Sequence, residues 1–163
     1  MPEAESARRD LDEIDRAILA ALHDDARMSN TELARRARIA ESTCHKRVRA
    51  LIASGVITGF HASIDAAALG LGLEALIAIR LHAHARGDLR RFQAYLERLP
   101  ATRHVYFVAG DRDFLLHVAV RDAAALRELV SDTLSVREEV AATNTSVIFA
   151  HVPGRSPLGD AEN

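Results

Sequence analysis

The sequence predicts an α+β protein in two parts, with helices first and alternating strands and helices afterwards. Three observations support this prediction. Apolar residues recur at helical spacing over residues 11–53, the pattern changes to that of strands from residue 73 onwards, and positive charge is concentrated in one segment of the first part. The chain of 163 residues is 48% hydrophobic, which is enough for one ordinary domain or two small ones.

Three helices are predicted in the first part. The first runs for about 13 residues from a start near Asp10, because Asp10 and Glu13 have the spacing of an N-terminal capping box. Ser29 and Glu32 repeat that spacing at the start of a short second helix. The third begins at residue 41 or 42 and ends at Gly55, which can adopt a left-handed backbone. Its predicted buried residues are Cys44, Val48, Leu51 and Ile52.

The second and third helices are joined by a tight corner, and this segment is strongly basic. Residues 27–61 hold seven basic side chains and two acidic ones, a local balance of +5 in a chain whose formal net charge is −2. Two short helices with a basic second helix are typical of a helix-turn-helix DNA reader. The alternative is a solvated charged face on an ordinary helical subdomain. The charge concentration favours binding to double-stranded DNA.

The predicted DNA contacts fall into two groups. Long cations are suited to phosphate oxygens, whereas side chains near the start of the third helix are placed to reach base edges. The predicted phosphate contacts are Arg35, Arg36, Lys46 and Arg49. The predicted base-edge contacts are Ser42, Thr43, His45 and Arg47, with His45 and Arg47 as the first choices among outward-facing positions.

Extended segments dominate the rest of the chain. Residues 56–60 and 61–65 are predicted to form two arms of a wing around a glycine turn. Strands are predicted over residues 73–83, 104–109, 114–120 and 141–152, and helices over 88–99 and 123–134. The order strand, helix, strand, strand, helix, strand indicates a ferredoxin-like βαββαβ sandwich. Its helices cover one sheet face, so the other face requires a partner and oligomerisation is expected.

Several other classes of protein are disfavoured. Apolar stretches such as residues 69–79 are interrupted by Gly70, Gly72 and Glu74, so none approaches the roughly 20 residues that cross a bilayer. The N-terminus does not have the pattern of a secretion signal, and we expect a cytoplasmic protein. The single Cys44 is expected to be a buried apolar residue rather than a redox sensor.

Histidines in the second part raise the question of a metal site. His82 and His84 are predicted to lie on the same side of a strand, but no cysteine or carboxylate accompanies them. No nucleophile elbow, phosphate-binding glycine loop or metalloprotease motif is present in the sequence. We therefore expect no metal, no cofactor and no catalytic residue.

Four separated motifs together resemble one known family. They are LDEIDRAILAAL at residues 11–22, DDARMSNTELARRARI at 24–39, RVRALIASGVITGFHASID at 47–65 and VAGDRDFLL at 108–116. In this order they resemble the leucine-responsive regulatory protein/AsnC (Lrp/AsnC) transcription regulators over residues 11–152. The resemblance implies a winged helix-turn-helix domain (1–61), a linker (62–72), an effector-binding and oligomerisation domain (73–152) and a tail (153–163).

The resemblance also implies an effector and an assembly. Family members form dimers that assemble further into tetramers or octamers, and they respond to an amino acid or a related metabolite. The effector would lie between dimers, against the turn Gly110, Asp111, Arg112 and Asp113 and against Thr143 and Thr145. These residue types suit an α-amino acid, because an aspartate can accept its ammonium group, and backbone amides or hydroxyls can donate to its carboxylate. The alternative is a turn chosen only for its geometry.

Two positions depart from the family pattern. Arg112 stands where relatives have an aromatic or apolar residue between the aspartates, which keeps open an orphan regulator without effector. Ala40 stands where relatives place a capping serine, which removes about 1 kcal/mol from the third helix. Proteins of the same architecture include sirohaem decarboxylases, so an enzyme of that kind is a further alternative, against which the basic third helix argues.

Overall fold

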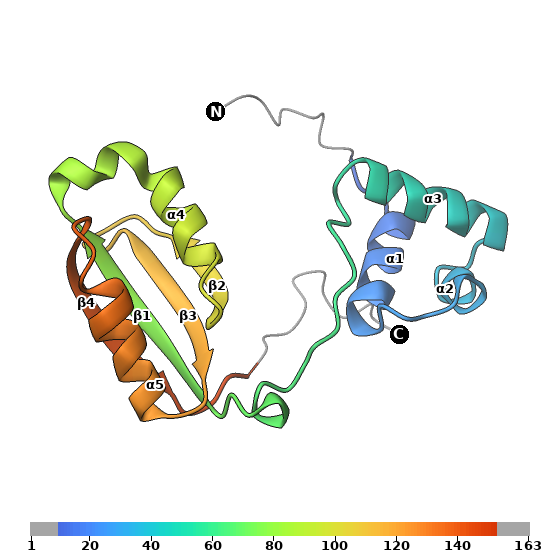
Figure 1. Cartoon of the computed structure of the whole chain (residues 1–163). Helices are drawn as coiled ribbons and strands as arrows, with labels where there is room; N and C mark the ends of the chain where they lie inside the picture. Colours follow the sequence, from blue (N-terminus) through green and yellow to red (C-terminus); the bar gives the residue numbers. More distant parts are fainter. Residues whose placement is uncertain (1–9, 153–163) are drawn as a thin grey trace. The chain divides into compact units, whose positions relative to one another are not determined.

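The computed structural model describes residues 10–152, so the predicted tail lies outside the described residues. The chain divides into two compact units, with the boundary between Ser63 and Ile64 (Figure 1). In the described part, no helix is long and apolar enough to cross a membrane. The two units are described separately below.

The N-terminal unit contains three helices. They are α1 (Glu13–Asp24), α2 (Asn30–Arg36) and α3 (Glu41–Ala53). Their shared core is small and apolar, with Ile18, Leu33, Cys44 and Leu51 almost fully buried. Cys44 is buried as predicted, and its burial raises the pKa of the thiol, which lowers its reactivity at neutral pH.

Caps determine where these helices begin. Asp12, rather than Asp10, caps α1, because its Oδ1 accepts a hydrogen bond of 2.8 Å from the amide of Asp15. The prediction of Asp10 was wrong because the Asp12–Asp15 pair has the same spacing, and both members also bond to α3. Ser29 caps α2 as predicted, through a 3.2 Å bond from the Glu32 amide to its Oγ.

Helix α3 starts without a side-chain cap and stops at a glycine. Ala40 occupies the cap position with extended backbone and no capping side chain, so the helix begins at Glu41. At the other end, Gly55 has a φ of 72° and donates its amide to the Ile52 carbonyl at 3.0 Å. Both ends therefore follow the sequence prediction.

The predicted arms of the wing do not pair. Residues 56–65 contain no strand, and Val56, Phe60 and Ile64 remain exposed. Ile52, which was predicted to be buried, is 46% exposed. The reason is that α1 and α2 cover the side of α3 that carries Cys44 and Leu51, and Ile52 does not belong to this core.

The C-terminal unit is an antiparallel sheet with helices on one face (Figure 1). Its main elements are β1 (Leu73–Leu81), α4 (Leu89–Glu97), β2 (Thr102–Phe107), β3 (Phe114–Val120), α5 (Ala123–Glu128) and β4 (Val140–Ile148). Short 3-10 helices cover Ala67–Leu69 and Ala83–Asp88, and a π-helix, Leu129–Leu134, continues α5. The strand order β2-β3-β1-β4 is that of the predicted βαββαβ fold.

Alternate residues of the central strand β1 build the core of this unit. Ala75, Ile77 and Ile79 are fully buried under the helices, which contribute Phe92 and Leu96 among others. The intervening residues face the uncovered side of the sheet. Strand β1 ends at Leu81, so His82 and His84 lie beyond the strand on which they were predicted. Strand β2 begins two residues earlier than predicted, and β4 ends four residues earlier.

Candidate DNA-binding and effector sites

One side of α3 presents polar and cationic residues. Ser42, Thr43, His45, Lys46 and Arg49 are all exposed, as the prediction of DNA contacts requires. The opposite side of the helix is buried through Cys44 and Leu51. A helix held by one face with hydroxyl, imidazole and cationic groups on the other can enter a major groove.

Arg47 does not belong to this outward face. Its Nη1 donates to Asp12 Oδ2 at 2.7 Å and to Asp15 Oδ1 at 2.9 Å, and only 23% of its side chain is exposed. Asp15 is 1% exposed. The prediction that Arg47 faces outward was therefore wrong, because two carboxylates of α1 and its cap draw the guanidinium inward. The cluster ties the start of α1 to the middle of α3.

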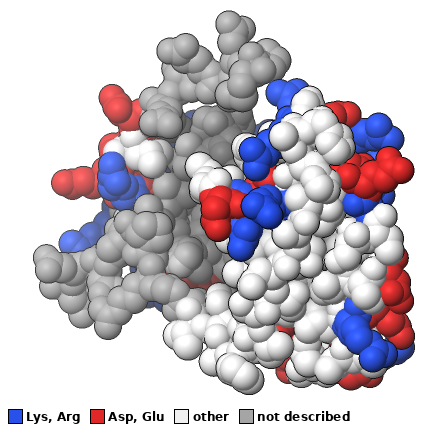
Figure 2. Space-filling model, turned by 90° about the vertical axis from the view of Figure 1, so that its left-hand side faces the viewer, with Lys and Arg blue, Asp and Glu red and all other residues white. Residues whose placement is uncertain are grey.

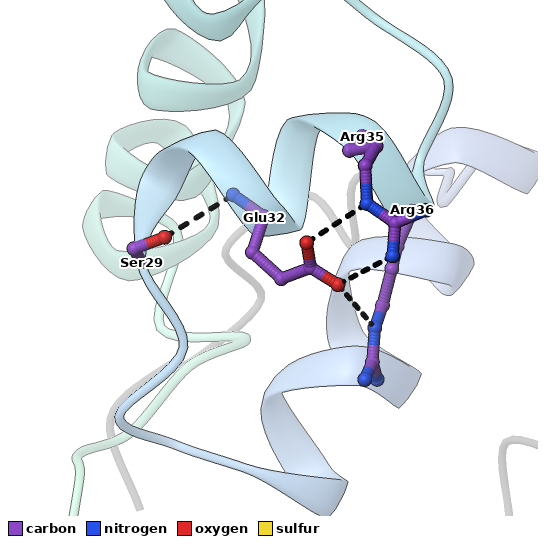
Figure 3. Close-up of polar contacts among 4 residues, drawn as sticks. All are labelled: Ser29, Glu32, Arg35 and Arg36. Carbon is purple, nitrogen blue, oxygen red and sulfur yellow. Dashed lines mark hydrogen bonds and ion pairs between the residues drawn. The ribbon is translucent and has the colours of Figure 1, made fainter.

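Two cations of α2 share one carboxylate (Figure 3). Arg35 binds Glu32 through its Nε and Nη2 at 2.8 and 2.7 Å, and Arg36 Nε lies 3.3 Å from Glu32 Oε1. The Arg35 guanidinium, with help from Arg36, lowers the pKa of Glu32 to about 2. A lowered pKa means that the pairing stabilises the fold above the ordinary pKa and is lost only as the pH falls towards 2. At neutral pH, Arg35 and Arg36 are exposed but already partly neutralised.

The turn between β2 and β3 contains the predicted effector residues. Gly110 has a φ of 128°, a conformation that favours glycine. Asp111 is 87% exposed, and its carboxylate lies 3.6 Å from the Arg112 guanidinium. Arg112 thus pairs with Asp111 and not with Asp113. This leaves a carboxylate and a guanidinium side by side at the surface.

Asp113 has a structural role instead. It is 9% exposed, its Oδ2 accepts the Leu81 amide at 2.7 Å, and its Oδ1 lies 3.1 Å from Arg86 Nε. Its own amide donates to the Ile79 carbonyl at 2.9 Å. Asp113 therefore fastens the turn to the end of β1, and its carboxylate is already bound within the chain.

The predicted threonines lie on the other side of β1 from this turn. Thr143 pairs with Ile79 and Thr145 with Ile77 along β4, whereas Phe114, which follows the turn, pairs with Ile79 along β3. Two strand spacings, about 10 Å, separate them. Within one chain, the turn and the two threonines therefore lie at the same sheet but do not contact each other.

A cleft that the sequence did not reveal lies at the start of α4. Its volume is about 780 Å³, and it runs between the segment before α4 and the loop before β4. Arg137 stacks on the Tyr95 ring at 4.0 Å and bonds to Glu139 at 2.7 Å, and the Arg137 guanidinium lowers the pKa of Glu139. Arg91 and Glu138 also line the cleft. Loop residues from two distant segments form it, so no sequence motif predicts it.

The uncovered sheet face has a histidine cluster. His117 Nε2 lies 2.8 Å from Glu74 Oε2, and the His104 and His117 rings stack at 5.5 Å. With Tyr106 and His151 they border a small cavity of about 170 Å³. Over residues 10–152, no three His, Cys, Asp or Glu side chains are grouped so that they could hold a metal ion.

These features define a class of protein. A basic helix-turn-helix precedes a separate sheet domain with a charged turn and an uncovered face, which is the organisation of a DNA-binding regulator with a ligand-binding domain. Two family models match the chain accordingly, winged helix-turn-helix DNA-binding over residues 11–58 and Lrp/AsnC ligand binding domain over residues 74–158. The chain belongs to the Lrp/AsnC family of transcription regulators.

Similar proteins agree with this membership. The HTH-type transcriptional regulator AldR of Mycolicibacterium smegmatis is 54% identical over 150 residues, which cover 92% of this chain and 88% of that protein. The crystal structure of MtbAldR has a TM-score of 0.78 at 46% identity and covers 92% of this chain and 99% of that one. A transcriptional regulator of Neisseria meningitidis in complex with L-Met has a TM-score of 0.81 at 27% identity, covering 88% and 93%. The chain is thus a regulator rather than a decarboxylase.

The first prediction concerns Arg47. Replacing Arg47 with Ala leaves the buried Asp15 carboxylate without this cation, so we expect the midpoint of thermal unfolding of the N-terminal unit to fall by several degrees. Lys46→Ala, at the neighbouring exposed position, is the control and should leave the midpoint within a degree or two. Circular dichroism during heating measures both. Equal midpoints for the two variants would contradict the structural role of Arg47.

The second prediction concerns Glu32. Glu32→Gln releases Arg35 and Arg36, so DNA affinity should increase by about threefold and its dependence on salt should become steeper. Glu41→Gln removes the same charge, and no ion pair of Glu41 is present in residues 10–152, so its effect should be smaller. Fluorescence anisotropy with labelled duplex DNA at several salt concentrations separates the two. An equal gain from both variants would show that only net charge matters.

Proposed function

We propose that an α-amino acid or a related small metabolite controls this regulator by changing its assembly or its DNA affinity. The presence of a ligand-binding domain supports an effector, and the L-Met complex of the Neisseria relative supports an amino acid. Control of this kind requires different effector affinities in the two functional states, because equal affinity would not shift their balance.

The proposal for the effector site rests on the different surroundings of the two aspartates in the turn. Asp113 is engaged by Leu81 and Arg86, whereas the Asp111 carboxylate is exposed at the surface. Asp111 is therefore the acceptor for the effector's ammonium group, and the adjacent Arg112 is a donor for its carboxylate. Thr143 and Thr145 complete the site from a neighbouring subunit, since β1 separates them from the turn within one chain.

The same regulator is proposed to work as a homodimer that assembles further. The uncovered sheet face carries Leu76, Tyr106 and Ile148, which a monomer would leave in contact with water. Figure 2 shows one side of the molecule, on which uncharged residues form a broad area and charged side chains lie mainly towards its edges. A second copy that covered the sheet would remove Leu76, Tyr106 and Ile148 from water and would pair two helix-turn-helix domains.

We propose the DNA contacts from the side chains of α2 and α3 that are exposed to solvent. Arg35, Arg36, Lys46 and Arg49 are exposed cations for phosphate oxygens, and Ser42, Thr43 and His45 are exposed candidates for base edges. Arg47 leaves this set and becomes a residue that positions α3 through Asp12 and Asp15.

Calorimetry with individual amino acids tests the effector site. We expect one or a few to bind the full chain and to alter its affinity for DNA from beside its own gene, and Asp111→Asn should weaken that binding at least about tenfold. Glu138→Gln, in the cleft beside α4, is the matched control. Loss of binding in Glu138→Gln instead would move the effector to the cleft. No heat with any amino acid would leave an orphan regulator.

Light scattering tests the sheet face. Tyr106→Glu places a charge on the uncovered face and should reduce the molar mass in solution, because an unpaired carboxylate would be buried in the dimer. Phe107→Glu changes the next residue on β2, which lies on the opposite face and is 59% exposed, and should retain the assembly. If Tyr106→Glu keeps the mass of the unmodified protein, this face is not the dimer interface.

A further inference from the structure

The corner between α2 and α3 contains a backbone conformation that arginine rarely adopts. Arg38 has a φ of 54°, and it is the one residue other than glycine with a positive φ in the described range. The other three positions of this kind are occupied by Gly55, Gly70 and Gly110. A side chain raises the energy of this left-handed conformation, which is why glycine is favoured there.

Backbone hydrogen bonds hold Arg38 in this conformation. Its amide donates to the Arg35 carbonyl at 3.2 Å, and the next amide, of Ile39, donates to the Ala34 carbonyl at 3.0 Å. Ala34 and Ala37 are buried, and Ile39 packs against the same core. The geometry of the corner is therefore imposed by α2 and by the core, and it would be the same with glycine at this position.

Within residues 10–152, no contact of the Arg38 side chain compensates for the strain. The side chain is exposed, and none of the hydrogen bonds or ion pairs found among residues 10–152 involves its guanidinium. Arg35, Arg36 and Arg47, in contrast, are all bound to carboxylates of the same unit. A strained residue whose side chain has no partner in the described part of the chain suggests that the side chain is retained for an external partner.

The location of Arg38 identifies the external partner. The residue lies three positions before the start of α3, whose exposed face carries Ser42, Thr43 and His45. In a helix-turn-helix the first helix crosses the sugar-phosphate backbone and the second contacts base edges with its N-terminal residues, so the corner that joins them lies between the backbone and the groove. An unpaired guanidinium there has the charge and the fork of donors that suit a phosphate group.

We propose that Arg38 is a phosphate-binding residue of the DNA reader, and that its side chain is kept at a cost in folding stability for this interaction. The proposal extends the set of DNA contacts to a residue that belongs to the basic segment 27–61 but was not among the predicted phosphate or base contacts. Folding stability and DNA affinity should therefore respond in opposite directions to changes at Arg38. Removal of the side chain should stabilise the fold and weaken the complex with DNA.

The test compares three variants of the full chain, Arg38→Gly, Arg38→Asn and Arg38→Lys. Thermal unfolding is followed by circular dichroism, and binding is measured by fluorescence anisotropy at several salt concentrations. The probes are a duplex from beside the protein's own gene and a scrambled duplex of the same composition. We expect Arg38→Gly and Arg38→Asn to have an equal or higher unfolding midpoint, because both residues tolerate a positive φ.

Binding should change in the opposite direction. Arg38→Gly and Arg38→Asn should weaken binding to both duplexes to a similar extent, and the slope of log affinity against log salt should become shallower by about one unit for each phosphate that the protein no longer neutralises. Arg38→Lys should retain most of that slope. An unchanged slope in Arg38→Gly, or a lowered unfolding midpoint, would overturn the proposal. Failure of the unmodified protein to bind either duplex would instead count against the DNA-binding function itself.

Discussion

Each unit is held together by contacts of one buried carboxylate. Asp15 and Asp113 are the two charged residues buried in the described part of the chain. An ionised carboxylate is tolerated away from water only when cations and amides compensate it, so the partners of each aspartate are constrained in position. Asp15 is bound by Arg47 of α3, and Asp113 is bound by the Leu81 amide and by Arg86. The placement of α3 and of the turn between β2 and β3 depends on these bonds.

Pairing also divides the abundant arginines by role. Arg47 is withdrawn from the surface, Arg35 and Arg36 are shared with Glu32, and Arg38 and Arg49 remain exposed. A count of charges in the sequence does not distinguish these arginines from one another as contributors to a DNA-binding surface. The cations available to DNA are fewer than the sequence count, and part of their charge must first be released from Glu32.

Elements with strong local signals could be predicted from the sequence. The alternation in β1, the apolar periodicity of the helices, and the stop at Gly55 each depend on neighbours along the chain, so the fold class and nearly all elements were correct. The roles of Arg47 and Asp113 depend on partners more than 30 residues away, at Asp12 and Asp15 and at Leu81. Contacts with such distant residues leave no periodic pattern in the sequence. Helical spacing alone therefore placed Arg47 on the outward face and did not reveal its bonds to Asp12 and Asp15.

The two arms of the wing were predicted in too much detail. Residues 56–65 have the composition of extended arms but form no paired strands, although Ile57 packs against the core of the helices and its amide donates to the Leu51 carbonyl at 3.1 Å. The cleft beside α4 arises only when two loops meet at one end of the sheet. Both features are decided by tertiary contacts rather than by local preference.

Residues 58–65 contain no strand and join the two units of the chain. Fully extended, eight residues reach roughly 28 Å, so in the proposed dimer this segment would limit how far each helix-turn-helix can lie from its own sheet domain. Binding of one helix-turn-helix would then raise the effective concentration of the other near the adjoining half-site, and part of the affinity for DNA would come from avidity.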